Sequence, residues 1–128
     1  MVEYAIRKVT KLSFDEALAK LPELLKEEGF GVLTEIDVKA TMKKKLDVDF
    51  RRYRILGACN PKFAHQALAE DIDVGVMMPC NVVVYEGDDG THVNAIDIGR
   101  TIGMLENPRL SELGRQVSEK LGRVLEKL

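Results

Sequence analysis

Two β-prone runs either side of residue 90 constrain the fold of this chain more than any other feature. The first run, from Asn81 to Tyr85, reads NVVVY, and the second extends from Thr91 to Ile98. Only the segment from Glu86 to Gly90 (EGDDG) separates them, and its composition is typical of a hairpin turn. Strands joined by so short a turn pair antiparallel, since a parallel connection needs a crossover of about a dozen residues or more. The hairpin therefore argues against a doubly wound parallel sheet.

Strand and helix patterns alternate along the rest of the chain. Strands are predicted over Val2 to Val9, Val32 to Ile36 and Tyr53 to Ala58. Residues suited to helix N-caps precede the predicted helices: Ser13, Asp37, Asn60 and Asn107. Asp71 to Met78 lacks clear periodicity, and Gly99 to Glu106 is predicted to be a loop. The order β-α-β-α-β-α-β-β-α predicts an α+β fold of two layers, with helices packed on a mainly antiparallel sheet of about five strands.

Length and composition predict one domain and limit its partners. The chain has 128 residues, the size of one domain, so we expect a single domain over residues 1–128. Its formal net charge of −2 gives no overall attraction for nucleic acid or anionic membranes. The N-terminus has no apolar signal region, and no stretch approaches the roughly 18 apolar residues of a membrane span. We therefore expect a cytoplasmic protein, whose 31% of charged residues is typical of thermophile compositions.

The most unusual chemistry lies between Ile55 and Tyr85. This stretch holds both cysteines, each beside an asparagine and a proline, in Cys59-Asn60-Pro61 and Pro79-Cys80-Asn81. The first motif ends one predicted strand and the second begins another, so neighbouring strands would bring the two motifs together. Asn amides, thiols and two methionines at one edge of a sheet are typical of a small pocket with few polar groups. The predicted ligand-binding residues are Cys59, Asn60, Cys80 and Asn81.

These residues have other interpretations. Free cysteine commonly packs as a small hydrophobe, and the asparagines suit a helix cap and a strand entry. A thiol-dependent redox protein or enzyme would use Cys59 or Cys80, which could also form a disulfide. Cys59, His65, Cys80 and His92 could surround zinc, but their spacing matches no zinc-finger pattern, so no metal is predicted. No catalytic motif is present and no cofactor is indicated, which leaves open whether the protein is an enzyme.

A basic patch supports a further alternative. Between Lys39 and Arg54, seven basic residues outnumber two acidic ones. The part from Lys43 to Arg54 could hold phosphate groups or nucleic acid. Its stacking aromatics are limited to Phe50 and Tyr53, and a run of charges is usually a solvated face. Binding of a small ligand is therefore favoured over binding of nucleic acid.

The predicted last helix carries one continuous apolar stripe. Its members recur at helical spacing: Leu110, Leu113, Val117, Leu121, Val124 and Leu128. Gly114 and Gly122 lie next to the stripe and could allow another element to approach closely. Two or three helices can cover only one face of the sheet, and large exposed apolar patches tend to mark interfaces. We therefore expect a homodimer that buries the uncovered sheet face or the helix stripe.

Several short motifs together carry a family resemblance. They are Ile55-Leu56-Gly57-Ala58-Cys59-Asn60-Pro61, Ala67-Leu68, Asp71, Gly75, Pro79-Cys80-Asn81-Val82 and Tyr85, preceded by Gly29-Phe30 and the run from Glu35 to Leu46. With these motifs the chain resembles domain-of-unknown-function family 302 over nearly its whole length. The resemblance implies a small, dimeric α+β domain and no established activity. The match thins after His92, where Ile102-Gly103-Met104 replaces an expected acidic-proline pair.

Overall fold

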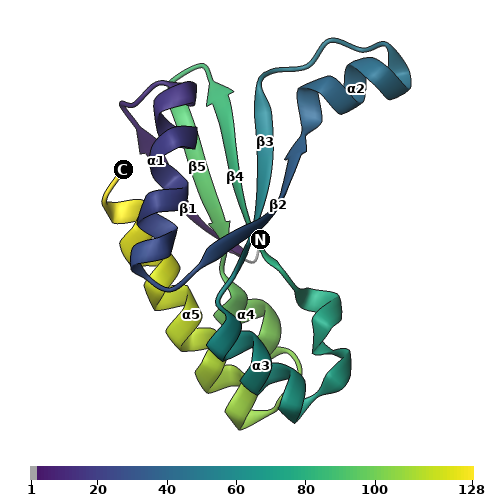
Figure 1. Cartoon of the computed structure of the whole chain (residues 1–128), viewed down its shortest axis with the longest axis vertical. Coiled ribbons are helices and arrows are strands. Elements are labelled where there is room, and N and C mark those ends of the chain that lie inside the picture. Colours follow the sequence, from purple (N-terminus) through teal and green to yellow (C-terminus); the bar gives the residue numbers. More distant parts are fainter. Residues whose placement is uncertain (1–2) are drawn as a thin grey trace.

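The computed structural model describes residues 3–128 and is built on a five-stranded antiparallel sheet (Figure 1). The strands are β1 (Ala5–Thr10), β2 (Gly31–Asp37), β3 (Tyr53–Cys59), β4 (Cys80–Gly87) and β5 (Gly90–Ile96). Their order across the sheet is β1-β5-β4-β3-β2, and every neighbouring pair is antiparallel. The predicted α+β class and strand number are confirmed. The predicted first strand began at Val2, which lies outside the described residues, and β1 begins at Ala5.

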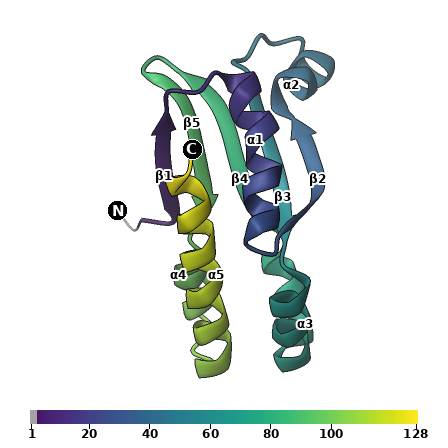
Figure 2. The same cartoon turned by 60° about the vertical axis from the view of Figure 1, so that its left-hand side comes forward.

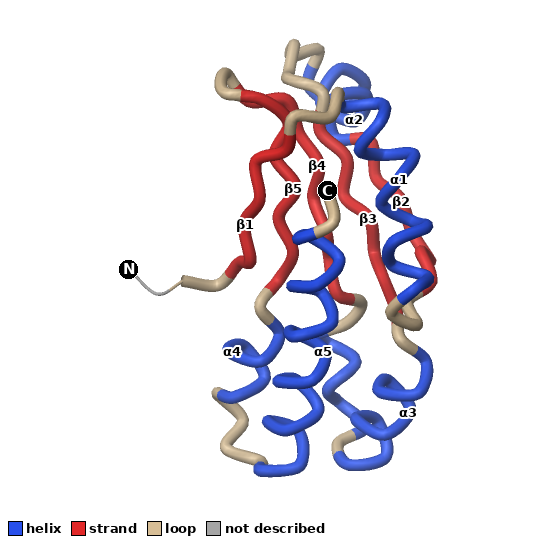
Figure 3. Tube along the Cα trace, turned by 90° about the vertical axis from the view of Figure 1, so that its left-hand side faces the viewer, coloured by secondary structure: helices blue, strands red, loops and turns tan. Residues whose placement is uncertain are grey.

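The helices occupy three positions around the sheet. The two long ones, α1 (Phe14–Glu27) and α5 (Pro108–Glu126), pack on one face (Figure 2). Three short elements lie beyond one end of the strands: α3 (Pro61–Glu70), the 3₁₀ helix η1 (Ile72–Met77) and α4 (Ile98–Gly103) (Figure 3). The last, α2 (Val38–Leu46), projects from the opposite end (Figure 1). Among residues 3–128, no helix is long and apolar enough to cross a membrane.

Local side-chain bonds account for several helix starts. Ser13 Oγ accepts a hydrogen bond from the Glu16 backbone N–H at 3.1 Å, and Glu16 Oε1 accepts one from the Ser13 N–H at 3.0 Å. This reciprocal pair is the capping box that begins α1. Asp37 Oδ1 accepts from the Ala40 N–H at 2.9 Å, and Asn107 caps α5 in the same manner. The predicted caps Ser13, Asp37 and Asn107 are therefore confirmed.

The core lies between the sheet and the two long helices. Leu21 and Leu25 of α1 and Leu121 of α5 are at most 1% exposed and pack in one cluster with the valines of β4 and β5. The apolar stripe of α5 faces this core: Leu110, Val117, Leu121 and Val124 are buried, and Leu113 and Leu128 are half-buried. Docking of this stripe on the sheet leaves little of it for contact with a second molecule.

Two segments differ from their prediction. Gly99 to Glu106 was predicted to be a loop, but α4 begins at Ile98 and packs on α5. Gly114 of α5 allows the approach, because a Cβ there would lie 2.4 Å from Ile102 Cγ2. The apolar residues of α2 recur every four positions, yet none of its residues is buried, since the helix projects beyond the sheet. Packing of α4 depends on residues ten or more positions away, which local sequence patterns do not reveal.

Candidate functional site

The two Cys-Asn motifs lie side by side at one end of the sheet. In the register of β3 and β4, Ala58 is opposite Cys80 and Gly57 is opposite Asn81. Cys59 follows Ala58 directly, so both cysteines lie where β3 ends and β4 begins. Both are free thiols and half-buried. The structure thus brings the two motifs together, as their positions at strand ends predicted.

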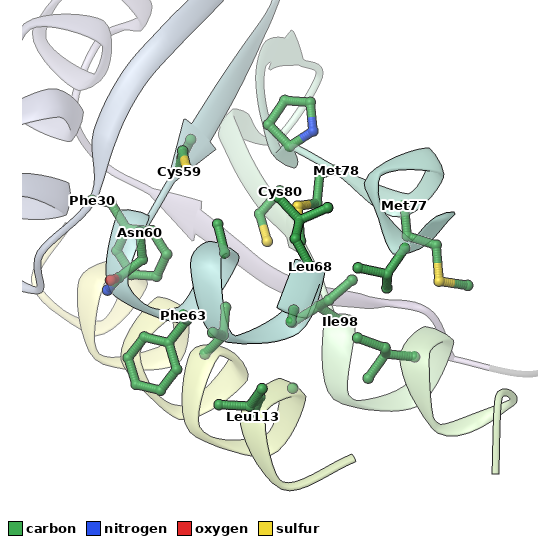
Figure 4. Close-up of a pocket in the computed structure, with 18 of the residues that line it drawn as sticks. Phe30, Cys59, Asn60, Phe63, Leu68, Met77, Met78, Cys80, Ile98 and Leu113 are labelled. Carbon is green, nitrogen blue, oxygen red and sulfur yellow. The ribbon is translucent and has the colours of Figure 1, made fainter. Parts of the chain in front are cut away.

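A cavity of about 340 Å³ opens next to these motifs (Figure 4). Cys59, Asn60 and Cys80 belong to its wall, with Thr34 of β2. The remaining wall is apolar. Most of it comes from α3, η1, α4 and α5, including Phe63, Leu68, Met77, Ile98 and Leu113, and the rest comes from the strands and the segments next to them: Phe30, Leu33, Ala58, Met78 and Pro79. No charged residue of the described range, residues 3–128, lines it. The cavity is therefore an apolar compartment with a few uncharged polar groups near the strand ends.

Asn81 does not line this cavity. It is exposed, whereas its neighbour Cys80 belongs to the cavity wall. Successive side chains of a strand point to opposite faces of the sheet, so the pleat directs the Asn81 amide away from the Cys80 thiol. Each of the two asparagines follows a cysteine in the sequence, but only Asn60 lines the cavity.

Asn60 has a bond that its sequence position did not predict. It occupies the N-cap position of α3, but its side chain makes no cap hydrogen bond. Its Nδ2 instead donates to the Glu28 carbonyl oxygen at 3.2 Å. That carbonyl belongs to the C-cap of α1, next to Gly29, whose φ is +87° and where a Cβ would lie 3.1 Å from Asn60 Nδ2. Asn60 therefore ties the end of α1 to the start of α3 and holds one side of the cavity wall.

The environment of Cys80 opposes its ionisation. Burial raises the pKa of the Cys80 thiol to about 11, and the adjacent Cys59 contributes in the same direction. The thiolate is the nucleophilic form, and a thiol with such a pKa holds only about one part in ten thousand as thiolate at pH 7. Cys80 therefore behaves as a neutral, polarisable part of the wall and is a poor nucleophile.

Of the four residues considered for zinc, the two histidines lie away from the two cysteines. His65 is exposed on α3, and His92 pairs with Tyr85 near the hairpin turn, at the other end of β4 from Cys80. The His92 Nε2 lies 2.5 Å from Asp89 Oδ1, so its ring is engaged by that carboxylate. Within residues 3–128, no group of three or more His, Cys, Asp or Glu side chains is placed to hold a metal ion.

Acidic side chains neutralise much of the basic patch. Arg54 pairs with Glu35 at 3.2 Å and with Asp37 at 3.3 Å. Lys43 lies 3.0 Å from Asp47, and Arg52 lies 2.5 Å from an Asp15 oxygen on α1. These exposed pairs lower the net positive charge that a phosphate group would meet. Three of the seven basic residues of the patch are thus paired, and part of its positive charge is offset.

Sequence reasoning did not identify most of the cavity wall. Thr34 lies on β2 beside a β-bulge between Val32 and Thr34, and it faces Gly57, where a Cβ would lie 2.2 Å from Thr34 Oγ1. Ile98 and Ile102 come from α4, which was predicted as strand end and loop. The available signal was the spacing of two isoleucines, Ile98 and Ile102, four residues apart, and one such interval is too short to show a helical period.

Comparison with known proteins places the chain in a family. The family model described as "Domain of unknown function DUF302" matches residues 6–128. The crystal structure of an uncharacterized conserved protein DUF302 from Bacillus stearothermophilus is 30% identical, with a TM-score of 0.92 and 98% of each chain covered. No curated protein matches the chain. The family model covers nearly the whole chain and the fold agrees with that of the crystal structure, and the chain therefore belongs to the DUF302 family.

Proposed function

We propose that this domain binds a small molecule in the cavity at the end of the sheet. The cavity itself supports the proposal, since about 340 Å³ lies within the usual range for small-molecule sites of about 300–1,000 Å³. Protein interiors are otherwise close-packed and leave few voids larger than a water molecule. Cys59, Asn60 and Cys80 are in its wall, and Asn81 is outside it.

Binding is favoured over catalysis by the composition of the wall. Catalysis of proton transfer or acyl transfer needs a titratable base or an activated nucleophile near the substrate. The ionisable groups of the wall are the two thiols, and the Cys80 pKa of about 11 keeps that thiol protonated. A redox function of the cysteine pair is the alternative, supported by their position on neighbouring strand ends.

Filling the cavity tests the proposal. Ala64 of α3 lines the cavity, whereas Ala69 of the same helix is exposed and does not. Ala64→Leu places additional methyl groups in the cavity, so binding of the neutral fluorescent probe 1-naphthol, which has eleven non-hydrogen atoms, should weaken at least about tenfold, a change of roughly 1.4 kcal/mol. Ala69→Leu has the same change in composition and should leave binding unchanged. Equal probe affinity in both variants and the parent would contradict the cavity as the site.

We also propose that the protein is a homodimer that pairs through the sheet face opposite α1 and α5. On that face Tyr53, Tyr85 and His92 stack in a row, with ring centroids 5.3 Å and 4.7 Å apart. Ile55 and Val83 form the adjacent row in the β3–β4 register, and the helices leave this face uncovered (Figure 2). An uncovered face with aromatic and aliphatic rows is typical of an interface, and two-fold pairing is the commonest arrangement.

Sedimentation tests the homodimer. The parent should have roughly twice the 14.3 kDa chain mass at micromolar concentration. Val83→Lys should give monomers, because it places a charge in the middle of the proposed interface. Val76→Lys is the control, since Val76 is 89% exposed on η1, away from the sheet. A parent protein that stays monomeric at every concentration would show that the face is not an interface of this kind.

A further inference from the structure

We infer that the cavity selects an uncharged, mainly hydrocarbon molecule with at most one neutral polar group, such as an alcohol or a carbonyl. This inference rests on the proposed binding function and specifies its ligand class. The observation behind it is the chemistry of the wall, to which the described part of the chain contributes no lysine, arginine, histidine, aspartate or glutamate. A carboxylate or phosphate is ordinarily bound by charge-assisted hydrogen bonds, and the wall offers no cationic side chain for them.

The polar groups of the wall come from three strands and from the residue that follows β3. Thr34, Cys59 and Cys80 come from β2, β3 and β4, and Asn60 follows β3. The side chains from the helices are apolar, so a ligand would meet polar groups at the sheet end and hydrocarbon elsewhere (Figure 4). A ligand with one polar end and an apolar body fits this distribution of polar and apolar side chains.

The hydrogen bonds available to the ligand are weak. A thiol is a weak donor and a weak acceptor, and one N–H of the Asn60 amide is already given to the Glu28 carbonyl. Such groups can satisfy one neutral oxygen atom. They cannot replace the hydration of an ionised group, which would be lost on entering an apolar wall.

Cys80 shows how strongly this wall opposes charge. The pKa of its thiol is raised from 9.0 to about 11, mainly by burial, which corresponds to an approximately hundredfold penalty on the charged form. The N-terminus of α3 begins at the same wall, and a helix dipole favours an anion, but the main cause acting on the Cys80 thiol is burial, which opposes the charged form. A carboxylate bound against Cys80 should meet a penalty of similar size.

The volume limits the size of the ligand. A water molecule, with its one non-hydrogen atom, takes about 30 Å³ in the liquid. A volume of 340 Å³ therefore corresponds to roughly eleven non-hydrogen atoms. A medium-chain or compact cyclic molecule of about ten non-hydrogen atoms would fill the cavity. A long acyl chain would extend beyond it.

Matched ligands test the inference on the intact protein. 1-Nonanol and octanoate have equal numbers of non-hydrogen atoms and differ in charge at pH 7.5. Each is titrated against bound 1-naphthol, and 1-nonanol should bind about a hundredfold more tightly than octanoate. Octanoate binding as tightly as 1-nonanol would overturn the inference while leaving the binding function intact. Failure of the probe and of both ligands to bind would overturn the binding function and the inference together.

A charge placed in the wall should change the selectivity. Met77 lines the cavity and its neighbour Val76 does not. Met77→Lys should therefore raise the affinity for octanoate relative to 1-nonanol at least about tenfold, because the ammonium group can pair with the carboxylate. Val76→Lys adds the same charge outside the cavity and should leave the ratio unchanged. An equal change of the ratio in both variants would show that long-range charge, and not the wall, decides selectivity.

Discussion

Replacing Gly114 by alanine would show how closely α4 and α5 are packed. A Cβ at this position would lie 2.4 Å from Ile102 Cγ2, 3.2 Å from Gly99 Cα and 3.3 Å from the Ile98 carbonyl oxygen. Non-bonded carbon atoms are optimally separated by about 3.5–4.0 Å, so Ile102 has to move by roughly 1 Å or more. Backbone atoms of α4 limit any movement of the new methyl group in the other direction.

The expected loss of stability follows from two opposing terms. Overpacking of a filled site costs about 1–3 kcal/mol, and alanine gains about 1 kcal/mol over glycine in helix propensity. Gly114→Ala should therefore lower the free energy of unfolding by up to about 2 kcal/mol. Gly122→Ala in the same helix meets no atom within 4 Å, so it should raise that free energy by up to about 1 kcal/mol.

Urea unfolding of the two variants and the parent measures both effects. Because the propensity gain is common to both substitutions, the difference between the variants isolates the steric cost, which should be about 1–3 kcal/mol. An unchanged urea dependence of the unfolding free energy would show that the denatured states are equivalent. If the two variants are equally stable within about 0.5 kcal/mol, the contact between Gly114 and Ile102 is not as close as the structure describes.

Three further predictions concern the thiol, one ion pair and one hydrogen bond. Because its pKa is about 11, Cys80 should resist iodoacetamide at pH 8 until urea unfolds the protein, and rapid labelling of the folded form would contradict this. Hydrogen bonding to Arg123 lowers the pKa of Glu28 below its usual 4.5, so the pair should stabilise the fold above that pH and lose this effect as the pH falls through the lowered value. The free energy of unfolding of Glu28→Gln should depend less steeply on pH in the acid range than that of the parent. Identical slopes for the two proteins would show that the Glu28–Arg123 pair is not coupled to folding. Asn60→Ala should lower the free energy of unfolding by about 1 kcal/mol, because it removes the hydrogen bond to the Glu28 carbonyl. Asn81→Ala should lower it by less than about 0.5 kcal/mol, since Asn81 is exposed, and thermal unfolding of both variants measures the difference.

The sequence by itself determined the features that depend on neighbours in the chain. The Ser13–Glu16 capping box and the Asp37 cap join atoms three residues apart, so their residue types predict them. The turn from Glu86 to Gly90 defined the hairpin of β4 and β5 for the same reason. Antiparallel pairing, the α+β class and the adjacency of the two Cys-Asn motifs followed from these local elements and their order.

Only the tertiary structure decided the cavity and its polarity. Its wall combines residues from Phe30 to Val117, and no local pattern connects positions so far apart. The Asn60 amide bonds a carbonyl 32 residues earlier and not its own helix, because packing of α1 brings that carbonyl within 3.2 Å. The pleat of β4 turns Asn81 away from Cys80, although the two are adjacent in sequence. Hydrogen bonds within a turn are encoded by nearby residues, whereas the composition of a cavity wall depends on which distant surfaces pack together.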